Sequence, residues 1–186
     1  LKLSTTGAFV WAKALPYVSG NFSSNESNAI AIDDAGNIYT TGGYGATADF
    51  DPNAGIYNLT SSGYQDIFVS KLDASGNFVW AKSMGNPTSG DVGNDITVDA
   101  AGNVYVAGQF QGTADFDPSA AVSNLTSAGS SDIFVVKLNS SGNLVWAKAM
   151  GGTNTEFAYS VKCDAAGNVY TTGNFQGTAD FNPGAG

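Results

Sequence analysis

The sequence lacks several residues on which much protein chemistry depends. Its 186 residues include no His and no Arg, and all seven cationic side chains are Lys. Without His there is no imidazole base, no Ser-His-Asp triad and no His-ligated metal site. Without Arg there is no bidentate clamp for phosphate or carboxylate. Any catalysis would therefore depend on carboxylates, Lys, Tyr, Ser or Thr.

Positive charge, cysteine and long apolar runs are also scarce. The formal net charge is −9, which opposes binding to nucleic acid and to anionic membranes. The lone Cys163 cannot form an internal disulfide, so cysteine usage does not indicate a compartment. No apolar run approaches the ~20 residues of a membrane span, and no signal-peptide pattern begins at Leu1. We expect neither a nucleic-acid partner nor a membrane span.

Turn-forming residues are abundant instead. Fourteen of the sixteen acids are Asp, and there are 24 Gly residues. Both residue types are weak helix formers that favour turns. An aromatic content of 12% argues against disorder, which normally depletes aromatics. The composition predicts a folded all-β protein.

A repeat of about 66 residues organises the chain. The sequence Val-Trp-Ala-Lys occurs three times, around Trp11, Trp80 and Trp146. An Ala-Gly-Asn turn also occurs three times, around Gly36, Gly102 and Gly167. A fixed period of this length indicates a tandem array of supersecondary units.

Each repeat predicts four strands. In the second repeat, residues 95–98, 104–108, 133–138 and 144–148 alternate apolar and polar side chains, as half-buried strands do. Short turns rich in Gly and Asn join the first strand to the second and the third to the fourth, which is typical of hairpins. Four antiparallel strands in a tandem repeat are typical of a β-propeller blade, here with one enlarged loop.

The motifs of the repeat also resemble those of a known family. The runs ITVDAAGNVYVAG (96–108), DIFVVKL (132–138) and GNLVWAK (142–148) are similar to the bacterial SBBP-type β-propeller repeat, and distantly to NHL-type blades. The resemblance extends over essentially the whole chain. It implies a propeller fold in secreted or surface proteins of bacteria, with many tandem copies, and it supplies no catalytic residues.

The sequence begins and ends within a repeat, not at a boundary between repeats. We expect a half-blade of third and fourth strands at 1–13, blades at 28–82 and 94–148, and a half-blade of first and second strands at 159–186. Joining the halves makes at most three blades, fewer than the four that a closed propeller needs. The chain is then part of a longer repeat protein, or it is completed by other copies as a ring or fibre. A monomer with bare strand edges is the third interpretation, which edge association disfavours.

The loops divide between two faces of the array. The tight hairpins lie on one face, and the long connections at 46–65 and 112–131 lie on the other. The variable connections at 14–27, 83–93 and 149–158 share that second face. Binding residues are often found in loops on a rigid scaffold, so a glycan or protein partner would bind there. The alternative is that these loops vary because nothing constrains them.

An Asp-Phe-Asp-Pro motif is the candidate metal site. Oxygen ligands recur at alternate positions, as Ca²⁺ prefers, in the pairs Asp49 and Asp51, Asp115 and Asp117, and Asp180 and Asn182. Only two such groups are local, and no EF-hand or RTX-like spacing is present. The alternative is that each acid caps local backbone N–H groups while Pro ends the strand. Ca²⁺ is the only cofactor that the sequence suggests.

Other recurrent residues favour structural roles. An Asp precedes each Ala-Gly-Asn turn, at Asp33, Asp99 and Asp164. An active site normally breaks the symmetry of a propeller, so an acid repeated in every blade is expected to cap its turn. The three Trp residues occupy one strand position and are expected to pack blade against blade, although an aromatic platform for a glycan is the alternative. Cys163 stands where other repeats have Val or Ile and is expected in the core.

Together these features predict a non-enzymatic extracellular scaffold with a structural or adhesive role. Its expected partners are further blades of a larger secreted protein or other copies of itself. The alternative is a propeller that binds carbohydrate or protein through the face with the long loops, with or without Ca²⁺. A six-bladed hydrolase or lactonase is disfavoured because no asymmetric acid cluster stands out.

Overall fold

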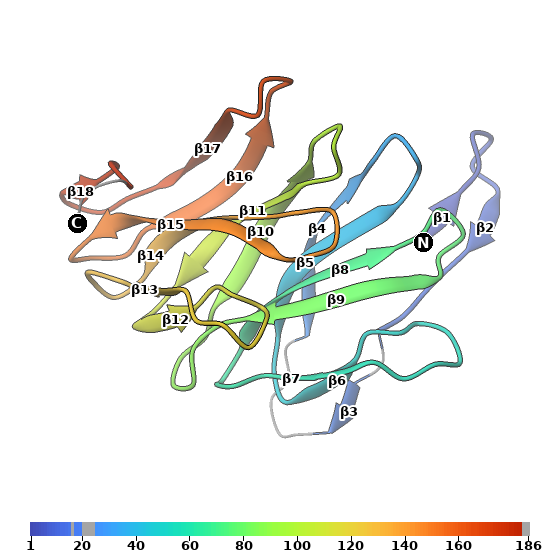
Figure 1. The fold of residues 1–186 in the computed structure, drawn as a ribbon, viewed down its shortest axis with the longest axis horizontal. Coiled ribbons are helices and arrows are strands. Elements are labelled where there is room, and N and C mark those ends of the chain that lie inside the picture. The colour runs from blue at the N-terminus through green and yellow to red at the C-terminus, as the bar shows by residue number, and fades with distance from the viewer. Residues whose placement is uncertain (16, 20–24, 184–186) are drawn as a thin grey trace.

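The computed structural model describes residues 1–15, 17–19 and 25–183, and in that part of the chain every helix or strand assigned is a β-strand (Figure 1). None of the described residues forms a helix long and apolar enough to cross a membrane. The predicted all-β class is confirmed. The strands are β1 (Lys2–Leu3), β2 (Phe9–Trp11), β3 (Tyr17–Ser19), β4 (Glu26–Ile32), β5 (Ile38–Tyr44), β6 (Thr47–Asp49), β7 (Asn58–Thr60), β8 (Asp66–Leu72), β9 (Phe78–Met84), β10 (Val92–Val98), β11 (Val104–Phe110), β12 (Thr113–Asp115), β13 (Asn124–Thr126), β14 (Asp132–Leu138), β15 (Leu144–Gly152), β16 (Phe157–Cys163), β17 (Val169–Asn174) and β18 (Ala179–Asp180).

Two four-stranded antiparallel units form the centre of the molecule. Blade 1 has the strand order β4-β5-β8-β9, and blade 2 has the order β10-β11-β14-β15 with the short β18 added at the end of β15. The pair β1–β2 is the N-terminal half-blade, and the pair β16–β17 is the C-terminal half-blade. Figure 1 shows these units side by side as an open fan, with the two chain ends on opposite sides.

The strand register repeats from blade to blade. In blade 1, Tyr39 of β5 is opposite Lys71 of β8, and in blade 2, Tyr105 of β11 is opposite Lys137 of β14. The hairpin turns repeat as well. Gly102 has a φ of +79° and donates its N–H to the Asp99 carbonyl at 2.9 Å. Glycine is the default residue for such a left-handed conformation, which explains its place in every turn.

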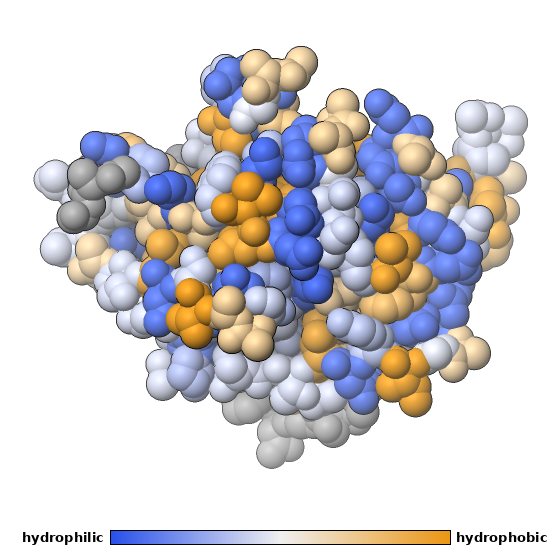
Figure 2. Space-filling view, in the orientation of Figure 1, coloured by the Kyte–Doolittle hydropathy of each residue, from blue (hydrophilic) through white to orange (hydrophobic). Residues whose placement is uncertain are grey.

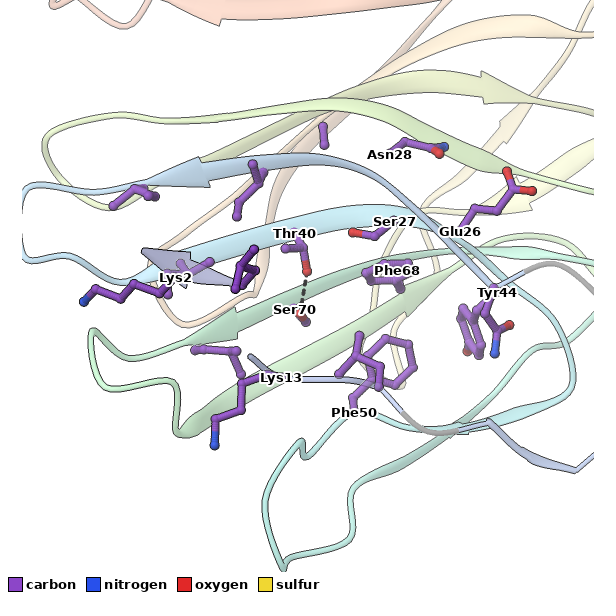
Figure 3. Close-up of a pocket in the computed structure, with 18 of the residues that line it drawn as sticks. Lys2, Lys13, Glu26, Ser27, Asn28, Thr40, Tyr44, Phe50, Phe68 and Ser70 are labelled. Carbon is purple, nitrogen blue, oxygen red and sulfur yellow. Dashed lines mark hydrogen bonds between the residues drawn. The ribbon is translucent and has the colours of Figure 1, made fainter. Parts of the chain in front are cut away.

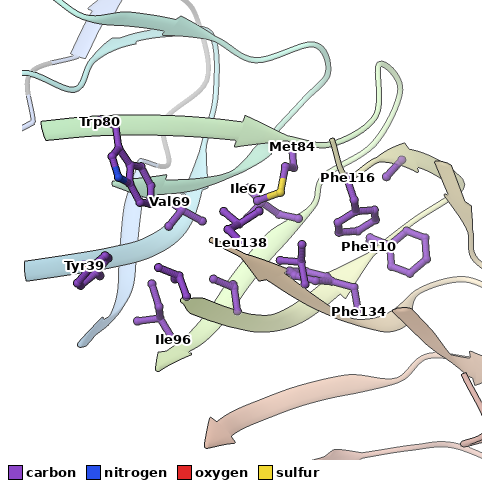
Figure 4. Close-up of a cluster of buried hydrophobic side chains, with 14 residues drawn as sticks. Tyr39, Ile67, Val69, Trp80, Met84, Ile96, Phe110, Phe116, Phe134 and Leu138 are labelled. Carbon is purple, nitrogen blue, oxygen red and sulfur yellow. The ribbon is translucent and has the colours of Figure 1, made fainter. Parts of the chain in front are cut away.

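The main core lies between blades. One cluster of buried side chains takes Tyr39, Val69 and Trp80 from blade 1, and Ile96 and Leu138 from blade 2, among others (Figure 4). A second cluster joins blade 2 to the C-terminal half-blade, and Cys163 packs against it. Because each blade buries one face against the next, stability depends on stacking, as expected for repeat proteins.

The sequence analysis predicted a long loop within each blade, but these connections are not open loops. Each contains a further hairpin, β6–β7 in blade 1 and β12–β13 in blade 2. Phe50 and Phe116 anchor these hairpins because their rings are buried. The Thr47 and Thr60 hydroxyls also share a hydrogen bond of 2.9 Å across the first hairpin.

These hairpins connect neighbouring blades. The Gly85 N–H after β9 donates to the carbonyl of Asp115 in β12 at 3.1 Å, and the Asp115 N–H donates to the Gly85 carbonyl at 3.0 Å. At the next junction, β15 continues to Gly152 instead of ending near residue 148, because β18 pairs with its last residues. Strand β10 likewise begins at Val92, ahead of the predicted 95, with a bulge before Asp95.

Two expected segments are only partly described. Residues 16 and 20–24 of the connection 14–27 lie outside the described residues, as do residues 184–186 of the predicted half-blade 159–186.

Candidate functional site

The turn acids are occupied by hydrogen bonds within their own hairpins. Asp99 Oδ1 accepts from the Asn103 N–H at 2.8 Å, and Oδ2 accepts from Asn103 Nδ2 at 2.8 Å and the Tyr105 hydroxyl at 3.0 Å. Burial raises the pKa of Asp99, but these hydrogen bonds outweigh it and hold the pKa below its usual range. Asp33 and Asp164 have the same partners in their own repeats. This geometry caps the turn and orients the tyrosine that follows.

The Asp-Phe-Asp-Pro motif has a comparable local arrangement. Asp115 Oδ1 accepts from the backbone N–H of Asp117 at 2.9 Å and of Ser123 at 2.8 Å, so it closes the β12–β13 hairpin. Asp117 Oδ1 accepts from the Ser119 N–H at 2.9 Å. The other copies repeat these bonds, with Asp49 and Asp51 as acceptors in blade 1 and Asp180 as the acceptor from Asn182.

A metal site would need more ligands than this motif brings together. Among the described residues, no three or more His, Cys, Asp or Glu side chains converge into a group that could hold a metal ion. Ca²⁺ takes six to eight oxygen ligands, of which each motif offers two side chains. Calcium binding stays a prediction of the sequence that the geometry around Asp49 and Asp115 does not favour.

Trp80 packs between blade 1 and blade 2. Its side chain is buried, its Nε1 donates to the Ser140 carbonyl of the next blade at 3.2 Å, and its ring meets Tyr39 edge-on at 6.2 Å. A Cβ added at Gly142, in the β14–β15 turn, would lie 3.2 Å from the indole. The turn of blade 2 therefore covers the Trp of blade 1.

The other two Trp residues have parts of this arrangement. Trp11, in the N-terminal half-blade, lies under Gly76 in the β8–β9 turn of blade 1, where an added Cβ would approach its ring to 3.2 Å. Trp146 packs on Tyr105 at 6.3 Å, and its side chain is only partly buried. The described residues hold no further turn to cover Trp146.

Buried acids at the blade junctions are functional candidates that the sequence analysis missed. Asp66 and Asp91 lie at the first junction, Asp132 and Glu156 at the second, and none is more than 3% exposed. Burial raises the pKa of Asp91 to about 7, and the nearby charge of Asp66 adds to this rise. Burial and the charge of Glu156 likewise raise the pKa of Asp132.

Their role at the junctions is visible in their hydrogen bonds. Asp91 accepts from the N–H groups of Asn86 at 2.8 Å and Gln111 at 3.0 Å, and so ties the connection between blades to the end of β11. The recurrence of an acid 65 residues later, at Glu156, is the signal that could have identified these positions. Since each acid serves its own junction, the set does not form one catalytic centre.

A groove of about 800 Å³ lies between the N-terminal half-blade and blade 1 (Figure 3). Apolar side chains from both units line it, among them Leu1, Leu3, Ile30, Ile38 and Leu72. Its size is that of a small-molecule site. Its charged residues are two lysines and one glutamate, which do not provide a pair of carboxylates for hydrolysis.

Polar contacts inside this groove are few. The Thr40 and Ser70 hydroxyls hydrogen-bond to each other at 2.8 Å on its floor, and so satisfy one another (Figure 3). On the face of the molecule seen in Figure 2, apolar groups are scattered among hydrophilic ones and do not merge into one patch. The apolar groove at the N-terminal end is thus the main candidate for an interaction site.

Comparison with known proteins finds a family model that matches one segment of the chain, and two relatives that are similar over a longer stretch. Residues 79–109, which run from β9 through β10 to β11, match the family described as SBBP β-propeller repeat. An uncharacterized WD repeat-containing protein of Acanthamoeba polyphaga mimivirus, L264, is 29% identical over 198 residues, or 94% of this chain and 14% of its own length. The regulatory protein FlaEY of Caulobacter vibrioides is 25% identical over 123 residues, or 66% of this chain and 13% of its own length.

This chain therefore spans about one seventh of the length of the curated relatives that it matches. The matched segment covers the last strand of blade 1 and the first two strands of blade 2, which is the junction where Trp80 and Ile96 share one core. The resemblance seen in the sequence is confirmed over residues 79–109, which match the SBBP β-propeller repeat.

Proposed function

We propose that this chain is a non-enzymatic structural scaffold built by stacking propeller-type blades, and that it acts outside the cell or at its surface. One observation carries the proposal: the recurrent polar and aromatic side chains hold turns and blade junctions together. The turn acids cap hairpins, Trp80 binds the next blade, and Asp91 ties a connection to its neighbour.

The second blade junction has further polar contacts of this kind. Asp95 Oδ2 of blade 2 accepts from Ser160 Oγ at 2.7 Å, the Val161 N–H at 2.8 Å and Lys162 Nζ at 3.1 Å. Asn94 Nδ2 also donates to the Ala158 carbonyl at 2.8 Å. These hydrogen bonds join one blade to the next, so they support an array that is stabilised by contacts between stacked blades.

The comparisons support the coarser part of this proposal. A β-propeller repeat family and a relative named for WD repeats indicate a repeat scaffold or a protein-interaction module. The extracellular location and the structural or adhesive role rest on the resemblance to bacterial surface repeats. The absence of His from the sequence removes the commonest acid–base group, which supports a non-enzymatic role.

A paired binding experiment tests the proposal. The chain is applied to a glycan array, and its self-association is followed by sedimentation over a range of concentrations. We expect no specific glycan signal and association that grows with concentration. The scaffold proposal would be wrong if the chain did not self-associate and bound one glycan specifically, and if a substitution within the connection 46–65 abolished that binding. The chain would then be a ligand-binding propeller.

A further inference from the structure

We propose that Asp132 and Glu156 share one proton in the folded chain, and that this proton makes the second blade junction a pH-sensitive contact. The proton supplies the hydrogen-bond donor that both carboxyl groups lack. Its loss leaves two negative charges buried at one junction. The inference goes beyond the scaffold function and does not depend on it, because it concerns how this junction is held together.

Two carboxyl oxygens at the second junction have no hydrogen-bond partner among the described residues. They are Asp132 Oδ1 and Glu156 Oε1. The Asp132 residue is 3% exposed and Glu156 is fully buried. An unpaired acceptor in the interior is costly, and more so when it carries charge. These two oxygens therefore require a donor.

The two carboxyl groups meet at the same pair of glycines. A Cβ added at Gly151 would lie 2.8 Å from Asp132 Oδ1, and the N–H of the next residue, Gly152, donates to Glu156 Oε2 at 3.0 Å. The Ala128 N–H donates to Asp132 Oδ2 at 3.0 Å. Each acid thus accepts from the backbone with one oxygen, and the remaining oxygens are the ones that a shared proton would join.

The first junction has the donors that the second one lacks. Ser62 Oγ donates to Asp66 Oδ2 at 3.0 Å and lies 3.3 Å from Oδ1. Asp91 Oδ1 accepts from Asn86 Nδ2 at 3.3 Å and from the Gln111 N–H at 3.0 Å, while its Oδ2 accepts from the Asn86 N–H at 2.8 Å. Every carboxyl oxygen of this first pair of acids therefore has a partner.

The corresponding side chains of the second junction cannot donate. Each replacement removes an O–H or N–H group, although the pair of acids is kept. All of these residues lie within the described chain, so the contrast is between two complete junctions. The positions are Tyr44, Ser62, Ser83 and Asn86 at the first junction, and Phe110, Ala128, Ala149 and Gly152 at the second.

The described segments around the pair bring no cation to neutralise it. Strand β11, residues 127–131 and residues 149–155 contain no charged residue. The charged side chains of the other packed strands lie elsewhere: Lys137 of β14 over the Tyr105 ring, Lys148 of β15 opposite Val135, Lys162 of β16 at Asp95, and the exposed Asp180 of β18 at the Asn182 N–H. Glu156 is thus the charged group that faces Asp132.

A proton fits this site better than a water molecule or a metal ion. Less than 1 Å² of each unpartnered oxygen is exposed, so no space for a water adjoins them. Ca²⁺ needs six to eight oxygen ligands, whereas a proton needs only the two oxygens that are present. Two neighbouring carboxyl groups that cannot both ionise hold one proton between them.

The junction is then most stable in acid. Burial and the charge of Glu156 raise the pKa of Asp132, so the folded chain keeps a proton that the unfolded chain releases above the ordinary pKa of 3.8. The stability that this proton contributes is fully present below that pH. It is lost as the pH rises through the pKa of the folded state.

Carbon-13 NMR of the carboxyl groups follows the proton directly in the unmodified chain. The signals of Asp132 and Asp99 are assigned by their absence from D132N and D99N. We expect Asp132 to ionise at higher pH than Asp99, whose hydrogen bonds hold its pKa below the usual range. Glu156→Gln should shift the ionisation of Asp132 to lower pH. Glu26→Gln, at the exposed second glutamate of the chain, should leave it unchanged.

Returning a donor to the junction tests the cause. Unfolding in urea is measured in a D91N background, so that the titration of Asp91 does not contribute. Between about pH 4 and pH 8, we expect the unfolding equilibrium constant of this parent to rise at least threefold relative to that of D132N. Ala128→Ser, which adds the hydroxyl that Ser62 provides at the first junction, should reduce the rise. Ala120→Ser adds a hydroxyl at an exposed position between β12 and β13 and should not.

Three results would overturn the shared proton. One is an Asp132 carboxyl that ionises together with Asp99 or that E156Q leaves unaltered. Another is a pH dependence that A128S and A120S change equally. The third is a melting temperature that millimolar Ca²⁺ raises in the unmodified chain but not in D132N or E156Q, since a metal ion would then occupy the site. None of them bears on the scaffold function, which self-association and glycan binding test.

Discussion

Replacing Trp80 by Ala probes the stacking of blades most sharply. The indole is 9% exposed and lies between Tyr39 of its own blade and the turn of the next blade. The substitution removes this packing together with the hydrogen bond from Nε1 to the Ser140 carbonyl. Trp146 is the matched control, because it has the same strand position and packs on the equivalent tyrosine, Tyr105, while no turn among the described residues covers it.

The expected magnitudes differ between the two sites. Truncating a buried aromatic side chain to Ala costs about 3–5 kcal/mol, through lost burial and the cavity left behind. The lost hydrogen bond to Ser140 contributes about 1 kcal/mol within that sum. Trp146 is only partly buried, so W146A is expected to cost about 1–2 kcal/mol.

Urea unfolding of each variant, followed by circular dichroism, measures the free energy of unfolding. The protein is kept dilute so that association between copies does not add to the measured stability. Equal losses in W80A and W146A would refute the claim that the next blade stabilises Trp80. A shift in glycan binding with no change in stability would refute the packing role altogether.

Three further changes test the turns and junctions. Gly142→Ala should destabilise the fold more than Gly7→Ala in urea titrations, because both positions have positive φ but only the Cβ at Gly142 would meet Trp80, at 3.2 Å. Burial raises the pKa of Asp91 from its ordinary 3.8 to about 7, so the folded chain holds a proton that the unfolded chain releases. The free energy of unfolding should therefore fall as the pH rises from about 4 to 7, and Asp91→Asn should flatten that slope. Asp95→Ala should cost about 1–3 kcal/mol in thermal melts because it leaves the Val161 N–H without its acceptor, whereas Lys162→Ala should cost less than about 1 kcal/mol since its ammonium is exposed. Equal losses in that last pair would contradict the assignment.

Most of the blade could be predicted from local pattern. The alternation of side chains and the Gly-Asn turns are sequence features that act over a few residues, so strands such as β11 and β14 lie close to their predicted ranges. The hairpin β12–β13 was missed because its strands are three residues long and are held by a buried Phe116 and by pairing to the previous blade. Neither feature is visible in a window of local sequence.

The candidate site was harder to predict for the same reason. Asp91 and Glu156 belong to none of the motifs that the sequence analysis selected. Their burial at junctions between blades, which raises the pKa of Asp91 and removes both side chains from solvent, depends on contacts between blades. The groove is likewise a property of the ends of the array. Ile30 and Ile96 occupy equivalent positions, but one is exposed and the other buried because only one has a full blade against it.

Sedimentation velocity of the unmodified chain, from micromolar to millimolar concentration, tests the proposed scaffold function most directly. The account predicts that the sedimentation coefficient of the chain rises with concentration. A single species at the size of the 19.0 kDa monomer throughout would contradict the account.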